Sequence, residues 1–252
     1  MNTKYYEINQ NGSNIRCKLY FEKGAAVQYA VITGHGFGGH KDNKAAERFA
    51  EHVLKKHKDA VIITFDWPCH GNDVKKKLTL ADCDAYLGQV IRDVCEKYPE
   101  AGLYGYATSF GGYLFLKYIH DHGSPFEKTA LRCPAVNMYG VLTKAIMKND
   151  EMDRLKKGKE VPVGFDRKIM VGQSFLDELQ KYDIREYDYL DYAENLLILH
   201  GTKDEVVPFE DSKAFAEDNL IEFIAVENAD HRFQNQKQMD EAIKQIQIFF
   251  SR

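Results

Sequence analysis

Short apolar runs alternate with amphipathic segments along most of this chain. The apolar runs are typical of strands that are covered on both faces of a sheet, and they lie at 27–33, 60–65, 101–107 and 128–133. The segments between them repeat apolar residues at helical spacing and lie at 43–56, 79–98 and 110–120. This rhythm predicts a mostly parallel sheet whose strands are joined by right-handed crossovers.

Both ends of the chain extend the pattern. Near the start, 5–8 and 15–21 alternate apolar and polar residues around a turn signal at 11–14, which predicts an antiparallel hairpin. Near the end, two further strands and two further helices are predicted at 195–200, 209–219, 221–226 and 239–250. We therefore expect an α/β fold whose central sheet has about eight strands and carries helices on both faces.

The alternation breaks in the stretch before the strand at 195–200. This stretch holds a charged run at 148–159, a loop-like segment at 161–164 and scattered aromatic residues. It has no Gly/Ser/Pro-rich linker at either end. We predict one domain over 1–252 with a cap insertion at about 135–190. The aromatic residues either form the core of that cap or contact a substrate, and the charged run is expected on a solvated face.

Composition and charge restrict the partners. Of the 252 residues, 44% are hydrophobic and 29% are charged, which is ordinary for a globular domain. The net charge is −4, and no apolar run approaches the ~20 residues of a membrane helix, so neither nucleic acid nor membrane is predicted as a partner. The 5 cysteines form no CxxC pair, which predicts reduced thiols in a cytoplasmic protein and no metal cluster.

Ser109 stands at a small-residue turn between the apolar run that ends at Ala107 and the helical segment that begins at Phe110. A serine hydroxyl is a weak nucleophile, so catalysis at this position would need a base and an oxyanion hole. The alternative is that Ser109 caps the N-terminus of the following helix. The turn alone is consistent with both interpretations.

A base and an acid are available after two other predicted strands. His231 follows the strand at 221–226, and Asp204 follows the strand at 195–200. The carboxyl ends of parallel strands are where α/β sheets gather their site residues. A surface histidine and an ordinary β-turn are the alternatives for these two positions. Glu205 and Asp230 compete with Asp204, and Asp230 ranks lower because neighbouring side chains usually diverge.

A glycine-rich loop at 34–40 follows the strand at 27–33. Glycines let the backbone approach a ligand closely, so the Phe37 N–H and the Phe110 N–H are candidate oxyanion donors. A phosphate-binding loop is the alternative, but the Gly-Lys-Ser/Thr ending and the GxGxxG spacing are both absent from the sequence.

Taken together, these motifs resemble the α/β-hydrolase superfamily. The stretch 35–39 (His-Gly-Phe-Gly-Gly) looks like its oxyanion loop, and 66–73 (Asp-Trp-Pro-Cys-His-Gly-Asn-Asp) looks like its Asp-x-Pro-Gly-x-Gly-x-Ser loop. The nucleophile elbow, the acid loop and the histidine loop are matched at 109–112, 200–208 and 229–233. The resemblance therefore covers most of the chain and implies the α/β-hydrolase fold.

Two positions depart from the family's pattern. Ala107 stands where the elbow usually has glycine, and alanine is small enough for that crowded turn. Cys69 replaces the glycine of the Asp-x-Pro-Gly loop. That loop lies outside the catalytic triad, so the implied reaction class is unchanged.

Within the superfamily, the arrangement is similar to bacterial cinnamoyl and feruloyl esterases. It implies a serine carboxylesterase that hydrolyses small carboxylic esters, hydroxycinnamoyl or short-to-medium acyl, through an acyl-enzyme. S33-type serine aminopeptidases and monoglyceride lipases share much of the pattern and are the alternatives. A non-catalytic hydrolase-like binding protein is a further alternative, against which the intact Ser109, Asp204 and His231 argue.

The resemblance also implies a role for each site residue. Ser109 attacks the ester, His231 shuttles the proton, and Asp204 orients His231. The N–H groups of Phe37 and Phe110 hold the oxyanion. Substrate contacts are implied for His35, Gly36, Gly38 and Tyr139. The implied partner is a small-molecule ester, and no metal or organic cofactor is implied.

Overall fold

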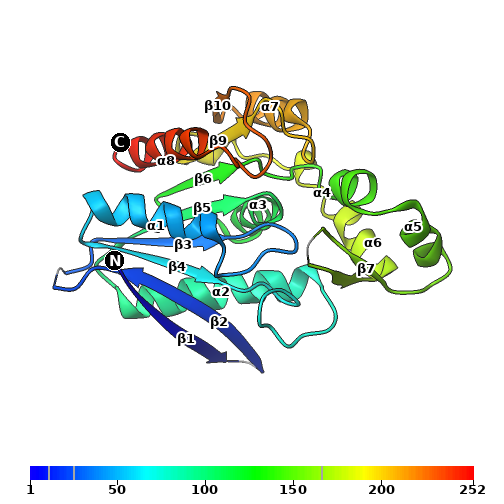
Figure 1. Cartoon of the computed structure of the whole chain (residues 1–252), viewed down its shortest axis with the longest axis horizontal. Coiled ribbons are helices and arrows are strands. Elements are labelled where there is room, and N and C mark those ends of the chain that lie inside the picture. Colours follow the sequence, from blue (N-terminus) through cyan, green and yellow to red (C-terminus); the bar gives the residue numbers. More distant parts are fainter. Residues whose placement is uncertain (11, 25, 166) are drawn as a thin grey trace.

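A mixed sheet forms the centre of the computed structural model, which describes residues 1–10, 12–24, 26–165 and 167–252 (Figure 1). Within these residues, eight strands form one sheet in the order β1-β2-β4-β3-β5-β6-β9-β10. Their bounds are β1 (Asn2–Gln10), β2 (Ser13–Phe21), β3 (Tyr29–Gly34), β4 (Ala60–Phe65), β5 (Gly102–Thr108), β6 (Lys128–Arg132), β9 (Leu196–Gly201) and β10 (Glu222–Val226). The chain has the predicted α/β-hydrolase fold.

The strand directions confirm the sequence pattern. β1 and β2 form an antiparallel hairpin, and β2 also pairs antiparallel with β4. The six strands from β4 to β10 in the sheet order run parallel to one another. The predicted hairpin turn at 11–14 includes Asn11, which lies outside the described residues, and Gln10 pairs with Ser13 across it.

Helices cover both faces of the sheet. Their bounds are α1 (Lys44–Lys56), α2 (Leu80–Lys97), α3 (Phe110–His122), α7 (Phe209–Asp218) and α8 (Gln236–Phe250). One core joins the sheet to α2, α3 and α7, and a second joins it to α1 and α8. Along β9, Leu196 and Ile198 enter the first core while Leu197 and Leu199 enter the second. This explains why the strand is apolar throughout, since both faces are covered.

The first two helices begin where the sequence indicates. Asn43 Oδ1 accepts a hydrogen bond from the Ala46 N–H at 2.8 Å at the start of α1. Thr79 Oγ1 accepts one from the Asp82 N–H at 3.1 Å at the start of α2. Each side chain satisfies a backbone donor that the first helical turn leaves open.

The segment between β6 and β9 contains several short elements, including a small antiparallel pair of strands. Its elements are α4 (Met138–Gly140), η1 (Val141–Ile146), α5 (Asn149–Lys156), β7 (Val161–Val163), β8 (Ile169–Val171), α6 (Gln173–Lys181), η2 (Ile184–Glu186) and η3 (Leu190–Asn195). Phe175, Leu179 and Tyr189 are fully buried in the core shared with α2 and α3. Most of the buried aromatics of the segment therefore stabilise its packing. In Figure 1 the central strands point their carboxyl ends toward this segment.

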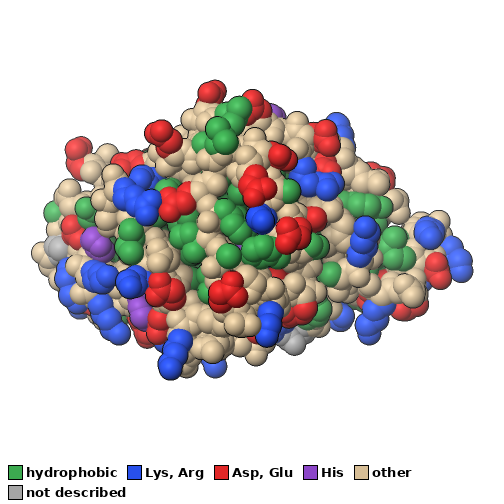
Figure 2. All heavy atoms as spheres, turned by 90° about the horizontal axis from the view of Figure 1, so that it is seen from above, with side chains coloured by type: hydrophobic (Ala, Val, Ile, Leu, Met, Phe, Trp, Pro, Cys, Tyr) green, Lys and Arg blue, Asp and Glu red, His purple; other side chains and the backbone are tan. Residues whose placement is uncertain are grey.

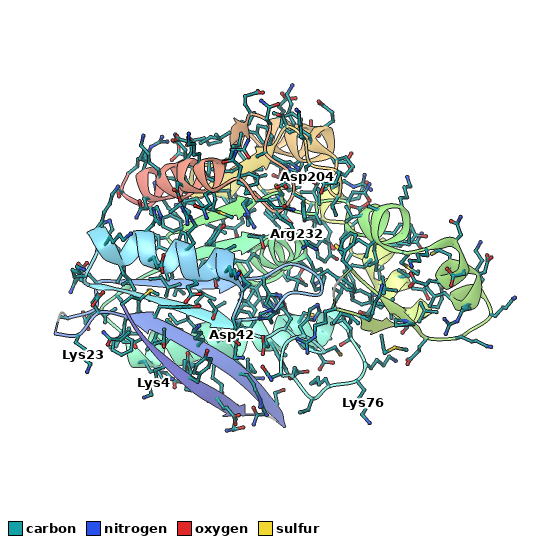
Figure 3. The ribbon with its side chains drawn as sticks, in the orientation of Figure 1. Lys4, Lys23, Asp42, Lys76, Asp204 and Arg232 are labelled. Carbon is teal, nitrogen blue, oxygen red and sulfur yellow. The ribbon has the colours of Figure 1, made fainter. Side chains whose placement is uncertain are left out.

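Charged side chains of both signs are mixed over the face seen in Figure 2, with hydrophobic side chains between them. Lys4, Lys23 and Lys76 project from the periphery, whereas Asp204 and Arg232 lie inside the outline of the fold (Figure 3). Among the described residues, no helix has both the length and the apolar character needed to cross a membrane.

Candidate active site

Ser109 occupies the turn between β5 and α3 in a strained backbone conformation. Its φ is 53° and its ψ is −119°, a region that residues with a side chain rarely adopt. It stands at the N-cap position of α3, but its side chain makes no capping hydrogen bond. The capping alternative therefore does not account for the serine. Strain of this kind costs about 1–3 kcal/mol and is concentrated at functional sites.

Close backbone packing beside Ser109 explains the glycine that follows in α3. A Cβ at Gly111 would lie 2.6 Å from the Gly34 carbonyl oxygen and 2.7 Å from that of His35. The start of α3 is thus pressed against the chain that leaves β3. Ala107, the departure from the family pattern, is fully buried and fits this turn.

Asp204 and His231 lie together after β9 and β10. The Nδ1 atom of His231 lies 2.7 Å from Asp204 Oδ2 and donates a hydrogen bond to it. The backbone N–H groups of Val206 and Val207 both donate to Asp204 Oδ1 at 2.8 Å. Three acids were candidates to orient His231: Asp204, Glu205 and Asp230. Asp204 is the one that contacts His231, whereas Asp230 accepts a hydrogen bond from the Gln234 N–H.

A second histidine also contacts this carboxylate. His200 Nε2 lies 3.1 Å from Asp204 Oδ2 and 3.2 Å from the Val207 carbonyl oxygen. Burial alone would raise the pKa of Asp204, but hydrogen bonds from His200, His231 and the Val207 N–H hold the pKa well below its usual range. The acid is therefore ionised at neutral pH and favours a proton on the Nδ1 atom of His231.

His200 was not among the residues predicted for the site. It forms a group with Cys133 and Asp204 whose ligand-type atoms lie within 4.8 Å of one another, a cluster that the cysteine spacing did not indicate. Burial raises the pKa of the Cys133 thiol well above its usual value, and the nearby Asp204 raises it further. The thiol is therefore protonated at neutral pH. The sequence signal for His200 was its position four residues before Asp204, at the end of a buried strand.

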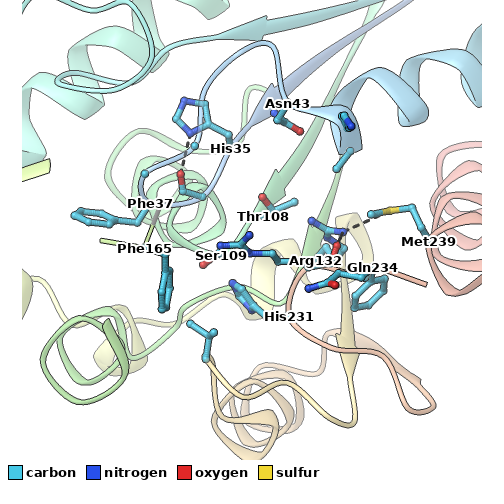
Figure 4. Close-up of a pocket in the computed structure, with 18 of the residues that line it drawn as sticks. His35, Phe37, Asn43, Thr108, Ser109, Arg132, Phe165, His231, Gln234 and Met239 are labelled. Carbon is cyan, nitrogen blue, oxygen red and sulfur yellow. Dashed lines mark hydrogen bonds between the residues drawn. The ribbon is translucent and has the colours of Figure 1, made fainter. Parts of the chain in front are cut away.

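Ser109 and His231 line one cavity of about 1220 Å³, which we call the Ser109 groove (Figure 4). It is also lined by parts of the β3–α1 loop, α1, the loop before α8, and the segment between β6 and β9. Within the part of the chain that the structure describes, no hydrogen bond joins the Ser109 hydroxyl to His231. The acid–base pair is therefore formed, and the serine–base hydrogen bond is not made in this conformation. Such bonds often tighten only when substrate is present.

The glycine-rich loop after β3 lies directly against Ser109. A Cβ at Gly36 would lie 3.2 Å from the Ser109 Cβ, and the Gly39 N–H donates to the Gly36 carbonyl oxygen at 3.0 Å. Neither the Phe37 N–H nor the Phe110 N–H donates a hydrogen bond to any described residue. Both N–H groups are therefore unpaired within the described chain, and an oxyanion hole requires unpaired donors.

Both ring nitrogens of His35 form hydrogen bonds, one of them to the backbone of this loop. Its Nδ1 donates to the Gly36 carbonyl oxygen at 2.9 Å, and its Nε2 accepts from the Trp67 backbone N–H at 3.4 Å. Burial lowers the pKa of His35 to about 3. The imidazole is therefore neutral at neutral pH, with one nitrogen a donor and the other an acceptor.

Asp66 joins the loops that follow β3 and β4. It is fully buried and accepts hydrogen bonds from the Lys41 N–H at 2.7 Å and the Asn72 N–H at 2.9 Å. A Cβ at Gly71 would overlap this carboxylate, so glycine is required there. The same loop carries His70, whose ring stacks on Phe110 and packs edge-on against Phe37.

Three of the four predicted substrate contacts line the Ser109 groove, namely His35, Gly36 and Gly38. Tyr139 does not line it. It is partly buried and packs against the core of α2 and α3, because α4 turns this side chain into the fold. Among the described residues of the segment between β6 and β9, Ile146, Phe165 and Arg167 reach the groove.

The sequence from 67 to 252 matches the prolyl oligopeptidase family, Peptidase_S9. The chain belongs to this family. The matched range includes Ser109, Asp204 and His231, whereas the Phe37 loop precedes it. The peptidase alternative drawn from the sequence was S33-type, and the matching peptidase family is instead S9.

Solved structures share the fold of this prolyl oligopeptidase family member over nearly its whole length. Est1E from Butyrivibrio proteoclasticus with bound ferulic acid is 16% identical, with 98% of this chain and 100% of that chain covered and a TM-score of 0.76. Alpha/beta hydrolase domain-containing protein 10 from mouse is 16% identical, with 98% of each chain covered and a TM-score of 0.73. A soluble variant of the monoglyceride lipase of Saccharomyces cerevisiae is 15% identical, with 98% and 94% covered and a TM-score of 0.72. No curated protein sequence matches the chain significantly. The family and the fold make this chain a hydrolase of the α/β-hydrolase type.

Proposed function

We propose that this chain is a serine hydrolase that cleaves small carboxylic esters through an acyl-enzyme. The observation that carries the proposal is the arrangement around the Ser109 groove. A strained serine and His231 line the same cavity, and His231 donates its Nδ1–H to a buried, ionised Asp204. A nucleophile, a base and a group that orients the base are the parts that acyl transfer needs.

The chemistry follows from the tautomer of His231. With a proton on Nδ1, its Nε2 has a lone pair that accepts the Ser109 hydroxyl proton as Oγ bonds to the ester carbonyl carbon. The imidazolium then returns a proton to the departing alkoxide, which leaves as the alcohol. Water repeats these two proton transfers, and the acyl group is released as a carboxylic acid. The charge of Asp204 stabilises each imidazolium.

The negative charge on the carbonyl oxygen needs preorganised donors. We assign this role to the N–H groups of Phe37 and Phe110. The Phe37 N–H belongs to the loop after β3. Gly36 lets this loop lie within van der Waals distance of Ser109, and His35 forms a hydrogen bond to the loop backbone. A donor of this kind typically contributes about 10²–10³ in kcat.

The segment at about 135–190 is proposed to act as a cap on a single domain of residues 1–252. Phe165 and Arg167 bring it to the Ser109 groove, and Tyr113 Oη donates to the Tyr182 carbonyl oxygen at 2.8 Å, which ties it to α3. Glu205, Val206 and Phe233 line the same groove. The cap is therefore where the shape of the acyl pocket is expected to be set.

Ester hydrolysis is supported by two of the structures of similar fold, one an esterase with ferulic acid and one a monoglyceride lipase. Peptide hydrolysis is the second candidate, and the match to the prolyl oligopeptidase family favours it. Both reactions use the same serine, base and acid. They differ in the leaving group, which must be protonated more fully when it is an amine.

A hydrolysis panel of short-chain, long-chain and hydroxycinnamoyl esters beside aminoacyl amides tests the proposal. We expect turnover of esters and labelling by a fluorophosphonate probe, and Ser109→Ala should lower kcat by roughly 10⁵–10⁶ with an unchanged thermal melt. Ser174→Ala, at an exposed serine of α6, is the matched control. Cleavage of the amides without the esters would establish the peptidase instead. Activity or labelling retained in Ser109→Ala would reject the nucleophile.

A further inference from the structure

Arg132 is a buried cation that lines the Ser109 groove, and its backbone pairs with that of Ser109. It is the last residue of β6, and its carbonyl oxygen accepts a hydrogen bond from the Ser109 N–H at 3.1 Å. Its side chain is only 6% exposed and lines the Ser109 groove (Figure 4). The other residues of β6 that face the cores are apolar or uncharged. An arginine at this position therefore needs an explanation.

No carboxylate neutralises Arg132 within residues 1–10, 12–24, 26–165 and 167–252. Its Nη1 donates to the Arg232 carbonyl oxygen at 3.3 Å and contacts Met239 Sδ at 3.4 Å. The guanidinium lies 5.0 Å from the centre of the Phe233 ring. Its Nε is buried and has no hydrogen-bond partner. A guanidinium stays charged in proteins, and a buried charge is costly unless it is paired.

The groove extends from Arg132 into the space between α1 and α8. Asn43 and Lys44 line it at the start of α1, and Gln236 lines it at the start of α8. Both helices thus direct their N-termini, which carry partial positive charge, toward the same space. These helix ends add to the field of the guanidinium, and an anion in the groove would be attracted by all three.

Among the residues described, Arg132 is the buried cation of the groove. Three other cations that line it, Lys44, Arg167 and Arg232, are exposed. Arg48 also lines the groove, but Asp240 holds it through two hydrogen bonds of 2.7 and 2.8 Å. Three carboxylates, Glu47, Glu51 and Glu205, line the groove as well, and none forms an ion pair with Arg132. The groove is therefore positive where the buried guanidinium of Arg132 lies.

We propose that Arg132 binds a carboxylate of the substrate, so that the preferred substrates are esters that carry a second, anionic carboxylate remote from the scissile bond. This inference rests on the proposed ester hydrolysis at Ser109. The planar guanidinium offers parallel N–H donors that match the two oxygens of a carboxylate. The anion would supply the partner that Arg132 lacks within the described chain.

Matched pairs of esters test the inference. Nitrophenyl monoesters of succinate, glutarate and adipate are compared with neutral acyl esters of equal length, and a third series carries the carboxylate on the alcohol side. We expect one carboxylate series to be preferred over its neutral counterpart by ~10- to 100-fold in kcat/KM. The series that is preferred shows whether the acyl or the alcohol part reaches Arg132.

Variants separate binding of the carboxylate from a structural role. In Arg132→Gln the ratio of kcat/KM between anionic and neutral esters should fall toward one, mainly through KM. Arg132→Lys keeps the positive charge but loses the parallel N–H donors of the guanidinium, so it should retain only part of the wild-type kcat/KM ratio. Arg185→Gln, outside the groove, removes the same formal charge from an arginine that Asp183 already pairs, and it should leave the ratio within about twofold. If Arg132→Gln lowered kcat/KM equally for anionic and neutral esters, the proposal would be overturned. It would also be overturned if the wild type showed a kcat/KM ratio near one between the two ester types.

Direct binding of glutarate keeps this test independent of turnover. Calorimetry should show glutarate binding to the wild type, with affinity at least ~10-fold weaker in Arg132→Gln. If no ester is hydrolysed and Ser109 is not labelled, but glutarate binding still depends on Arg132, the hydrolase proposal fails and the anion site stands. If esters are hydrolysed and glutarate does not bind, the anion site fails and the hydrolase stands.

Discussion

Asp204 shows how neighbouring groups decide what one side chain does. Its carboxylate lies in a fully buried position, where an isolated charge would be unstable. Two backbone N–H groups satisfy one oxygen, and His200 and His231 satisfy the other. This environment keeps the acid ionised beside the base. Glu205 and Asp230, only one residue from Asp204 and His231 respectively, have no such contacts with His231.

Removing the charge of Asp204 should therefore disable the base. Asp204→Asn should lower kcat by ~10⁴ because the amide favours the wrong tautomer of His231. Steady-state kinetics on the preferred ester checks this value. Asp230→Asn and Glu205→Gln are the matched controls, with expected losses below ~10-fold. A larger loss in either control than in Asp204→Asn would transfer the orienting role to that residue.

At the scale of elements, the approach of α3 to the end of β3 assembles the site. Ser109 and Phe110 begin α3, and Gly36 and Phe37 follow β3. These pieces meet because Gly111 lets the two backbones come together. The sequence pattern located both elements, and the glycines at 111 and 112 were consistent with close packing. How closely α3 packs against β3 is visible only in the structure.

Two helical glycines test this packing. Gly111→Ala should destabilise the fold by about 1–3 kcal/mol, since its Cβ would meet two backbone carbonyl oxygens that cannot move aside. Gly88→Ala in α2 should be neutral or stabilise by up to about 1 kcal/mol, because its Cβ would have ordinary contacts of 3.4 Å or more. Urea unfolding of both variants gives the comparison. Equal effects would show that helix propensity, rather than the contact with β3, decides the outcome.

At the scale of the whole molecule, the sheet joins residues that lie far apart in sequence. The Ser109 groove draws on the loop after β3, the ends of β5 and β6, and the loops after β9 and β10. His35 and His70 are buried in two of the loops at this edge, the loops that follow β3 and β4. Burial lowers the pKa of each imidazole to about 3. The site is therefore built on two neutral histidines inside the fold.

The stability of the molecule should consequently depend on pH. Below about 6.5 these histidines bind protons in the unfolded chain but not in the folded one, so the free energy of unfolding falls as the pH falls. Between pH 6.5 and 5 each should contribute a loss of roughly 2 kcal/mol. Urea unfolding at several pH values measures this slope.

A substitution of His70 measures the contribution of this residue to the pH dependence of the free energy of unfolding. His70→Asn should make the slope shallower by about one proton, whatever its effect on stability at neutral pH. Phe49→Leu, in the core of α1 and α8, has no titrating group and should keep the wild-type slope. An unchanged slope in His70→Asn would show that His70 is not neutral in the folded protein.

The sequence by itself determined the order and type of the main elements, since a strand covered on both faces must be apolar throughout and a surface helix must be amphipathic. It also placed Ser109, Asp204 and His231 after strands whose carboxyl ends share one edge. The tertiary structure alone decided what depends on contacts between distant residues. These are the hydrogen bond of Asp204 to His231, the second contact from His200, and the absence of Tyr139 from the groove. It also decided the setting of Arg132, because the lack of a carboxylate partner among the described residues has no pattern in sequence and depends on which distant side chains the fold brings together.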